Sequence, residues 1–187
     1  MACDINLGRK EPCKDVVGGI TAVYFANFGE YGTATVDGTT DEVDDFSDTA
    51  FSIYKYEVKG NSNLTQNITS SRENGTTFFE QVLSLTLHKL SKEDNKEIKL
   101  MAYGRPHVFV EDYNGNIFLV GREFGADVTG GTIVTGSAMG DMSGYTLTLT
   151  AMEKMPANFL AYTDNGGSPQ TWTIGTATAT IVEGTNS

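Results

Sequence analysis

The sequence predicts a mainly β protein: a β-sandwich or barrel of about seven to nine strands, with one flanking α-helix and a long protruding loop or hairpin. Three observations favour this class. Thr often alternates with apolar residues, the chain has 21 Gly, and only one segment has a helical period; such a pattern favours strands and turns. The length of 187 residues suits one domain. We therefore expect residues 1–187 to form a single β domain, with residues 1–18 as an N-terminal arm.

The first strand is expected at residues 19–27, where the run GITAVYFAN is apolar and rich in β-formers. Residues 31–36 can pair with it, because residues 28–30 (FGE) suit a turn.

Residues 37–75 are expected to form the protruding loop or hairpin. Between residues 37 and 48 every charged side chain is acidic, and residues 60–75 are rich in Asn, Ser and Thr. Residues 51–58 (FSIYKYEV) alternate like a strand. Because long excursions from compact domains are usually functional or disordered, we interpret the segment as a contact arm.

The strongest strand signal covers residues 76–90. Phe79, Leu83, Leu85 and Leu87 share one parity, and polar residues occupy most of the other. This period of two is typical of a half-buried strand.

The one helix is expected at residues 92–103. Ser91 and Asp94 form a capping box with a shorter carboxylate than usual, and Ile98 and Met101 can face inward. Gly104 and the following Pro end the helix.

Strands then resume. Residues 107–112 and 117–122 are joined by Asn114-Gly115, a strong signal for a hairpin. Gly/Thr-rich residues 125–140 suggest a connection with a strand at 132–135. Further strands are expected at three places, the last with a bulge or bend at Gly175: residues 144–152, 159–162 and 170–182.

No motif for chemistry stands out, so we expect no catalytic residue, cofactor or metal. His88 and His107 are scattered and are better read as exposed or hydrogen-bonded strand residues than as ligands. The glycine-rich stretches lack a following Lys-Ser/Thr, and no G-x-S-x-G motif occurs. Whether Cys3 and Cys13 pair is left open.

The charge limits the possible partners. The formal net charge is −11, which disfavours sequence-reading DNA binding but suits a surface that DNA slides past. Residues 1–15 carry no apolar core of a signal peptide, and no apolar run is long enough to span a membrane. We expect a protein made in a cytosol, with no membrane partner.

Residues 79–160 resemble the tail tube (major tail) proteins of tailed bacteriophages. The resemblance is carried by the order of FEQVLSLTLHKL, a short charged helix, VEDYNGNIFLVGRE and TGGTIVTGSAMGDMSGYTLTLTAMEKMPANFL. It implies a β-sandwich with a flanking helix. Six copies would pair edge to edge into a ring around a continuous inner barrel, through which DNA passes during ejection. It supplies no catalytic residue.

On that resemblance the expected partners are other copies of the chain, other phage tail or neck proteins, and DNA that passes without sequence-specific binding. The expected location is the virion tail, after synthesis in the host cytoplasm. A stacked tube and a single ring stay equally open. The alternative is a carbohydrate-binding or adhesion β-sandwich. The candidate inter-subunit contact residues all lie in the expected arm: Asp41, Asp44, Asp45, Phe46, Phe51, Asn63 and Asn67.

Overall fold

Strand β1 (Ile20–Ala26) crosses the middle of the molecule and is buried on both faces. Tyr24 packs into one hydrophobic core, while Val23 and Phe25 pack into a second core on the opposite side. A strand covered on both sides needs apolar side chains at nearly every position, which explains the apolar run from Ala22 to Ala26. The computed structural model describes residues 5, 7–11, 13–58 and 60–184.

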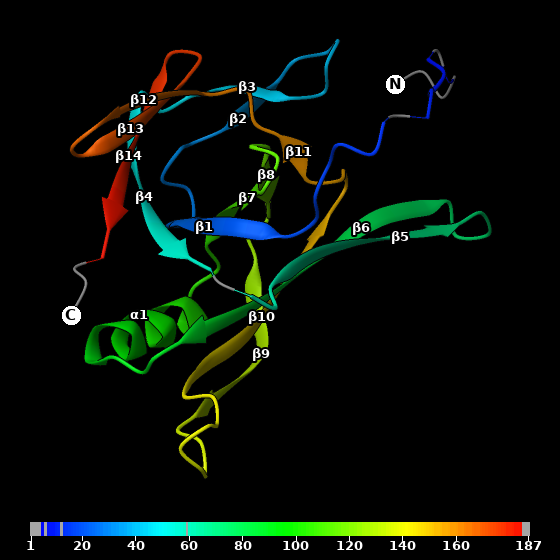
Figure 1. Ribbon diagram of the computed structural model, residues 1–187. Coiled ribbons are helices and arrows are strands. Elements are labelled where there is room, and N and C mark those ends of the chain that lie inside the picture. Colours follow the sequence, from blue (N-terminus) through cyan, green and yellow to red (C-terminus); the bar gives the residue numbers. More distant parts are fainter. Residues whose placement is uncertain (1–4, 6, 12, 59, 185–187) are drawn as a thin grey trace.

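A curled eight-stranded sheet surrounds the first core (Figure 1). Its neighbours are antiparallel except for one parallel pair, β14 with β4. A two-stranded ribbon, β2 (Ala34–Val36) with β3 (Val43–Phe46), lies over it. The strands of the large sheet follow in spatial order: β11 (Asn158–Phe159), β8 (Ile117–Val120), β7 (His107–Asp112), β1, β4 (Ala50–Glu57), β14 (Ala177–Glu183), β13 (Gln170–Ile174) and β12 (Thr163–Gly167).

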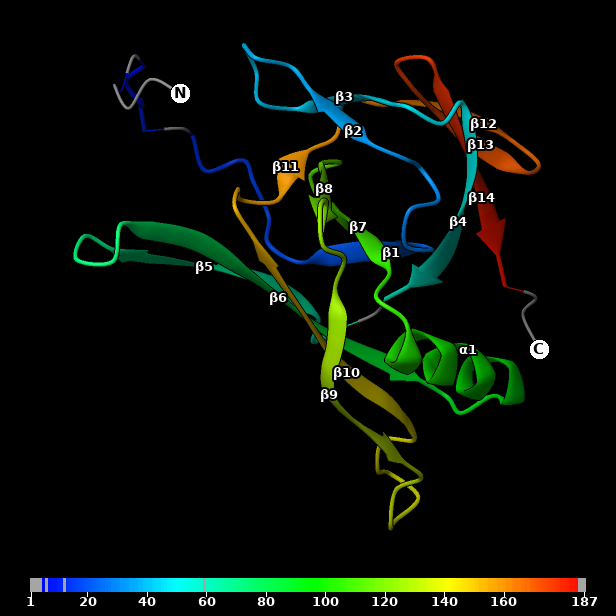
Figure 2. The same ribbon diagram turned by 180° about the vertical axis from the view of Figure 1, so that it is seen from behind.

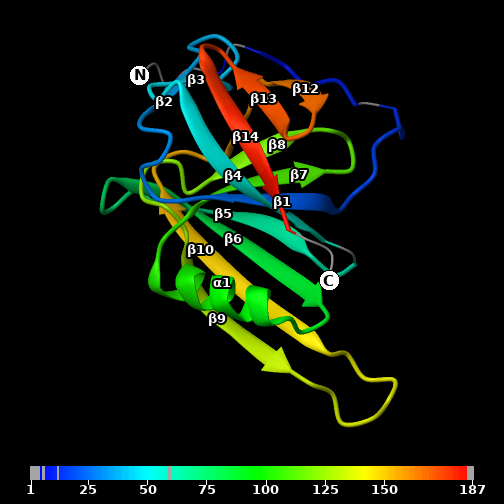
Figure 3. The same ribbon diagram turned by 90° about the vertical axis from the view of Figure 1, so that its left-hand side faces the viewer.

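A separate four-stranded antiparallel sheet covers the other face of β1 and β7, and the second core lies between the two sheets. Figure 3 shows α1 beside this sheet and the large sheet above it. Its strands follow in spatial order: β5 (Asn63–Ser71), β6 (Thr76–His88), β10 (Gly144–Glu153) and β9 (Asp127–Val134).

Helix α1 (Lys92–Tyr103) has the bounds expected from the sequence. The Ser91 side chain accepts a hydrogen bond from the Asp94 backbone N–H at 2.9 Å, and the Gly104 N–H donates to Leu100 O at 3.0 Å. Ile98 is buried and Met101 is half-buried against the second core. The helix start at Ser91 and the inward face are therefore confirmed.

Most of the expected strands are also present. β7 and β8 form the expected hairpin, in which Asp112 accepts from the N–H groups of Asn114 and Asn116 at 2.8 Å each and Gly115 has φ +81°. The single strand expected at residues 170–182 is instead a hairpin, because Gly175, with φ +57°, lies in a turn that joins the antiparallel strands β13 and β14. The fold class is confirmed as mainly β with one helix. The described residues form fourteen named strands, because several strands of two to five residues give no period that a sequence can reveal.

One expectation about strand pairing and one about strand bounds were wrong. Residues 31–36 do not pair with β1: β2 pairs with β3, while β1 lies between β4 and β7. The strand expected at 132–135 begins earlier, because β9 runs over Asp127–Val134. Its Gly130-Gly131 pair hides it from a pattern search.

The expectation that residues 37–75 form one protruding excursion was also wrong. The segment contains β3, β4 and β5, and β4 lies between β1 and β14 inside the large sheet. The alternation of residues 51–58 marked a core strand, whose distant partners no local pattern shows. The parts that protrude are the far end of the β5–β6 hairpin and the loop between β9 and β10 (Figures 1 and 2).

The N-terminal arm is extended where the structure describes it. Leu7, Val16 and Val17 are exposed, and the arm is attached by Val17, whose N–H donates to Asn114 Oδ1 at 3.1 Å and whose O accepts from Asn114 Nδ2 at 2.8 Å. Cys13 is exposed. Cys3 lies outside the described residues, so its pairing with Cys13 stays untested.

Candidate functional site: a four-stranded sheet with two open edges

The four-stranded sheet ends at β5 on one side and at β9 on the other, and no described strand pairs with the outer edge of either. Each outer strand therefore presents a row of backbone N–H and C=O groups that another strand can use. The edges of the large sheet differ: β11 has two residues, and β12 is the short segment TDNGG.

The face of this sheet that points toward the large sheet is apolar. Leu83 and Leu85 of β6 lie directly opposite Leu149 and Leu147 of β10, and all four are buried. Two leucine pairs side by side supply a continuous apolar layer for the second core. Burying this layer stabilises the sheet against β1 and β7.

The opposite face is mostly polar and rich in threonine, and its apolar residues are Phe78, Val82, Val134 and Met152. Thr129 Oγ1 lies 3.0 Å from Thr150 Oγ1, and Asn67 Nδ2 donates to Glu80 Oε2 at 3.2 Å. The charged or titratable side chains on this face are Glu80, Asp127 and His88. The register assigns these further polar side chains to it: Asn63, Thr65, Asn67, Thr69, Ser84, Thr86, Thr132, Thr146, Thr148 and Thr150.

No lysine or arginine occurs in any of the four strands. Hydroxyl and amide groups give this face hydrogen-bonding capacity without positive charge. A phosphate backbone therefore finds no cation there to which it can bind.

Two buried polar side chains fasten this sheet to the large one. Gln81 Oε1 accepts from the Gly121 N–H at 3.0 Å, and its Nε2 donates to Met155 O at 3.2 Å. Glu153 Oε1 accepts from the N–H groups of Glu123 and Phe124 at 3.0 and 2.9 Å. Burial raises the pKa of Glu153, while the hydrogen bonds from these N–H groups oppose the rise. Both side chains have structural partners.

His107 is a hydrogen-bonded core histidine, which matches one of the two readings made from the sequence. Its Nε2 accepts from the Gly29 N–H at 3.1 Å, so Nδ1 carries the proton and donates to Gly121 O at 2.6 Å. Tyr31 Oη lies 2.9 Å from the same Nδ1 and donates to Arg122 O. Burial lowers the pKa of His107, which keeps the ring neutral.

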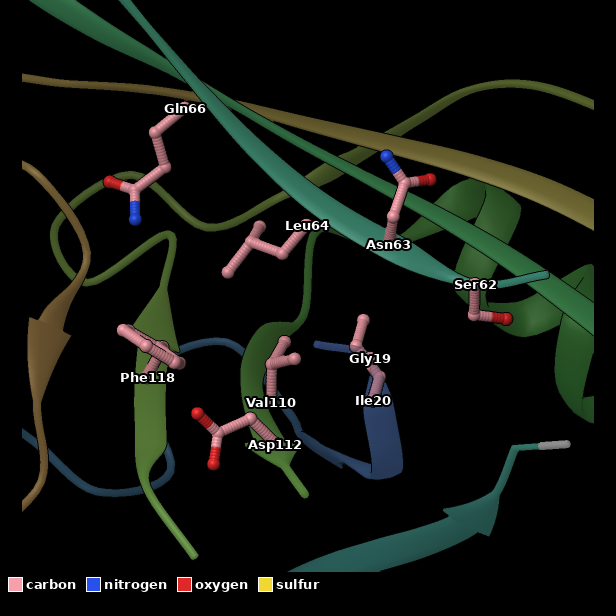
Figure 4. A pocket seen from close by; sticks show the side chains of 9 residues that line it. All are labelled: Gly19, Ile20, Ser62, Asn63, Leu64, Gln66, Val110, Asp112 and Phe118. Atoms are coloured by element: carbon pink, nitrogen blue, oxygen red, sulfur yellow. The ribbon is translucent and has the colours of Figure 1, made fainter. Parts of the chain in front are cut away.

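A cavity of about 300 Å³ lies between β5 and strands β1, β7 and β8 of the large sheet (Figure 4). Leu64 and Gln66 point into it from β5, and Val110 and Phe118 line the other side. Gln66 Oε1 accepts from the Ala157 N–H at 2.8 Å. The cavity is a seam between the two sheets, directly beside the open edge of β5.

The structure does not bring the seven expected contact residues together. Phe46 and Phe51 are core residues that pack around Tyr31, with ring centroids 4.6 and 6.0 Å from it. Asp45 accepts from the N–H groups of Thr176 and Phe46 at 2.9 Å each, which fixes β3 to the β13–β14 turn. Phe46 and Phe51 are therefore buried within one copy, and the half-buried Asp45 holds two of its strands together.

The other expected residues divide between two regions. Asp41 lies in the β2–β3 turn with φ +60°, and its backbone O accepts from Asn158 Nδ2 at 2.9 Å. Asp44 lies on β3. Asn63 and Asn67 lie on β5, on the polar face of the open edge. Only this last pair belongs to the candidate site.

Sequence reasoning missed the other edge, formed by β9. Ile133 is 58% exposed there, and Gly130 and Gly131 precede it. The available signal was an apolar–Thr alternation interrupted by the two glycines.

Comparisons with protein-family models, with curated proteins and with solved structures found no match. Among the residues that the structure describes, no group of three or more His, Cys, Asp or Glu side chains could hold a metal ion. Within the same residues no helix is both long and apolar enough to cross a membrane.

Proposed function

We propose that the protein is a structural component of a bacteriophage tail, whose copies join through their four-stranded sheets into a ring around a DNA conduit. One observation carries the proposal: a single sheet combines two open edges with a polar face that has no lysine or arginine. The resemblance of residues 79–160 to tail tube proteins points to the same function. In this proposal the protein has no enzymatic activity.

The open edges support self-association. Natural proteins usually protect an exposed sheet edge with Lys, Pro or a very short strand. β5 has nine residues and β9 has eight, and neither contains Lys or Pro. Strands of this length and composition suit pairing with another chain.

The strand directions support closure into a ring. Every neighbouring pair in the sheet is antiparallel. Because the sheet has an even number of strands, β5 and β9 run in opposite directions. A head-to-tail contact between identical copies therefore continues the antiparallel pattern, and a cyclic arrangement removes both edges.

The size of such a barrel supports a conduit. Six copies is the number that the resemblance implies. At about 4.8 Å between strands and a tilt of 35–45°, roughly 24 strands give a backbone diameter of roughly 45–52 Å. That leaves a bore wide enough for a DNA double helix after side chains are allowed for.

The charge of the bore supports passage without binding. In the proposed ring the polar face lines the lumen, and the protein as a whole has a net charge of −11. Like charges repel the phosphate backbone, while uncharged hydroxyl and amide groups offer no strong site. DNA would slide along this wall.

Negative-stain electron microscopy and light scattering of the purified full chain test the proposal. Rings or tubes with a central hole are expected. A monodisperse monomer at high protein concentration, with or without cross-linker and across a range of salt, would overturn it. Specific binding on a glycan array without any ring would instead favour a carbohydrate-binding module, although Trp172 is only 2% exposed and offers no sugar-stacking surface.

A further inference from the structure

The geometry points to one register between copies, an inference that rests on the proposed ring. We propose that β5 of one copy pairs antiparallel with β9 of the next copy, with Leu64 opposite Ile133 and Thr65 opposite Thr132. Each edge strand is thus paired with a strand from another copy of this chain. The register follows from four observations on the sheet.

The first observation is the offset between the two edges. Within one copy, residues that pair side by side across the strands form a row. Ile133 lies in the row of Leu87, because both pair with Tyr145. Leu64 lies on the row of Leu83. The two rows are four residues apart along β6. Across the whole sheet β5 lies on the rows of β6 residues 76–84 and β9 on the rows of residues 82–88, so the two edge strands lie toward opposite ends of β6.

The second observation is that this offset aligns the two strands over their full overlap. A shift of four residues places Asn63, Thr65 and Asn67 opposite Val134, Thr132 and Gly130. It leaves no residue between Gly130 and Val134 without a partner. The backbone groups of residues 63–69 in β5 then face a partner strand, as do those of β9.

The third observation is the match of side chains on the core-facing side. Ile133 is 58% exposed and Ile68 is 70% exposed in one copy. In the proposed register Ile133 packs against Leu64 of the next copy, and Ile68 lies opposite Val128. Two exposed apolar residues are thus covered by apolar cross-strand neighbours, which stabilises sheet pairing.

A bulge in β9 is compatible with this arrangement. The register of β9 against β10 shifts between Thr148 and Leu149, where Thr129 is the extra residue. Thr129 bonds to Thr150 on the polar face, so Val128 stays on the core-facing side. Because Ile68 also points to the core-facing side, Val128 remains opposite Ile68 across the bulge.

The fourth observation is the tilt that the offset implies. A closed barrel must offset its strands by a fixed amount for each strand added. A shift of four residues over four strands, at about 3.3 Å per residue and 4.8 Å per strand, gives a tilt of roughly 35°. Strands in closed barrels tilt by about 35–45°, whatever the number of copies.

Other registers that keep polar residues opposite polar residues fit less well. A shift of two residues gives a tilt of only about 20° by the same arithmetic and leaves Ile133 and Val134 beyond the end of β5. A shift of six gives about 46° but places Ile133 opposite Gln66 and Ile68 opposite Gly131. Apolar side chains would then lack apolar partners.

Disulfide trapping distinguishes the proposed register from the register with a shift of six. The background protein has Cys3→Ser and Cys13→Ser, and it receives either Thr65→Cys with Thr132→Cys or Asn67→Cys with Thr132→Cys. Directly opposite residues have Cα atoms about 4.5–5.5 Å apart, within disulfide range, whereas residues two positions away lie at about 7–8 Å. Within one copy β6 and β10 separate the two edges, so any cross-link joins different copies.

After mild oxidation, the Thr65–Thr132 pair is expected to give a ladder of covalent oligomers on denaturing gels, at least tenfold stronger than the Asn67–Thr132 pair. A stronger ladder from the Asn67–Thr132 pair would overturn the register and leave the ring intact. Rings of the background protein without cross-links from either pair would refute the proposed register and the shift of six as well. Absence of rings from the background protein itself would remove the proposed function together with this inference.

Discussion

Gln81 of β6 accepts a hydrogen bond from the backbone N–H of Gly121 at 3.0 Å, and both residues are buried in the seam between the two sheets. The same side chain donates to Met155 O. A single amide thus links the sheet with open edges to the rest of the domain. Loss of this amide removes the side-chain partner of the Gly121 N–H and of the Met155 O.

We expect Gln81→Leu to lower the free energy of unfolding by about 1–3 kcal/mol, because the Gly121 N–H and the Met155 O lose their partner in a buried site. Urea denaturation of the chain under non-assembling conditions measures the change. Ser84→Ala, on the polar face of the same strand, is the control and should change stability by less than about 0.5 kcal/mol. Equal effects of the two substitutions would contradict the role of Gln81.

His107 should make stability depend on pH. Burial lowers its folded-state pKa, so the unfolded chain binds a proton more readily than the native state does. The stabilisation is fully present above the unfolded pKa of about 6.5 and is lost as the pH falls through the folded pKa. Denaturation at a series of pH values should show this fall, and His107→Gln should flatten it.

Exposed His88 provides the comparison for that experiment. His88→Gln should leave the curve with the shape of the parent protein. If both histidine variants gave the same curve as the parent, the buried neutral state of His107 would not contribute to the acid sensitivity.

A charge swap between the edges should control assembly. Thr65→Lys combined with Thr132→Lys places like charges opposite each other at every proposed contact, and rings should disappear in low salt. Thr65→Glu combined with Thr132→Lys should restore them. Each pair contributes only about 0.2–1 kcal/mol, but the ring repeats it at every junction. Rings that persist equally in both variants would argue against facing positions for these residues.

A cation in the bore should convert a passive wall into a binding surface. Thr148→Lys places one lysine per copy on the polar face, and assembled rings should then bind duplex DNA with an affinity that falls as salt rises. The unmodified rings should bind at least tenfold more weakly in a fluorescence anisotropy titration. Thr40→Lys, in the exposed β2–β3 turn, is the matched control, and comparable DNA binding by this variant would place the polar face outside the lumen.

Much of the fold could be predicted from short sequence patterns. The capping box at Ser91, the turn at Gly115 and the alternation of Leu83 and Leu85 each depend on neighbours within a few residues. These features were predicted with nearly correct bounds. They can be predicted from the sequence because both residues of each interaction lie within a few positions of each other.

The segment 37–75 shows where such reasoning fails. Its acidic and polar composition suggested a solvent-exposed arm, yet Phe46 and Phe51 pack around Tyr31 in the first core. β4 takes β14 as a parallel neighbour from the far end of the chain. Removal of residues 38–74 would therefore delete a central strand of the large sheet as well as the exposed turns.

By itself the sequence determined the fold class, the single helix and the strongly alternating strands β6 and β10, since these follow from periodicity and turn chemistry. Only the tertiary structure decided which strands stand at the edges, and so which residues could meet another copy. The physical reason is that an edge is defined by the absence of a neighbour. β5 and β9 became edges because β6 and β10 paired with each other between them, a contact between segments more than fifty residues apart that neither edge strand encodes.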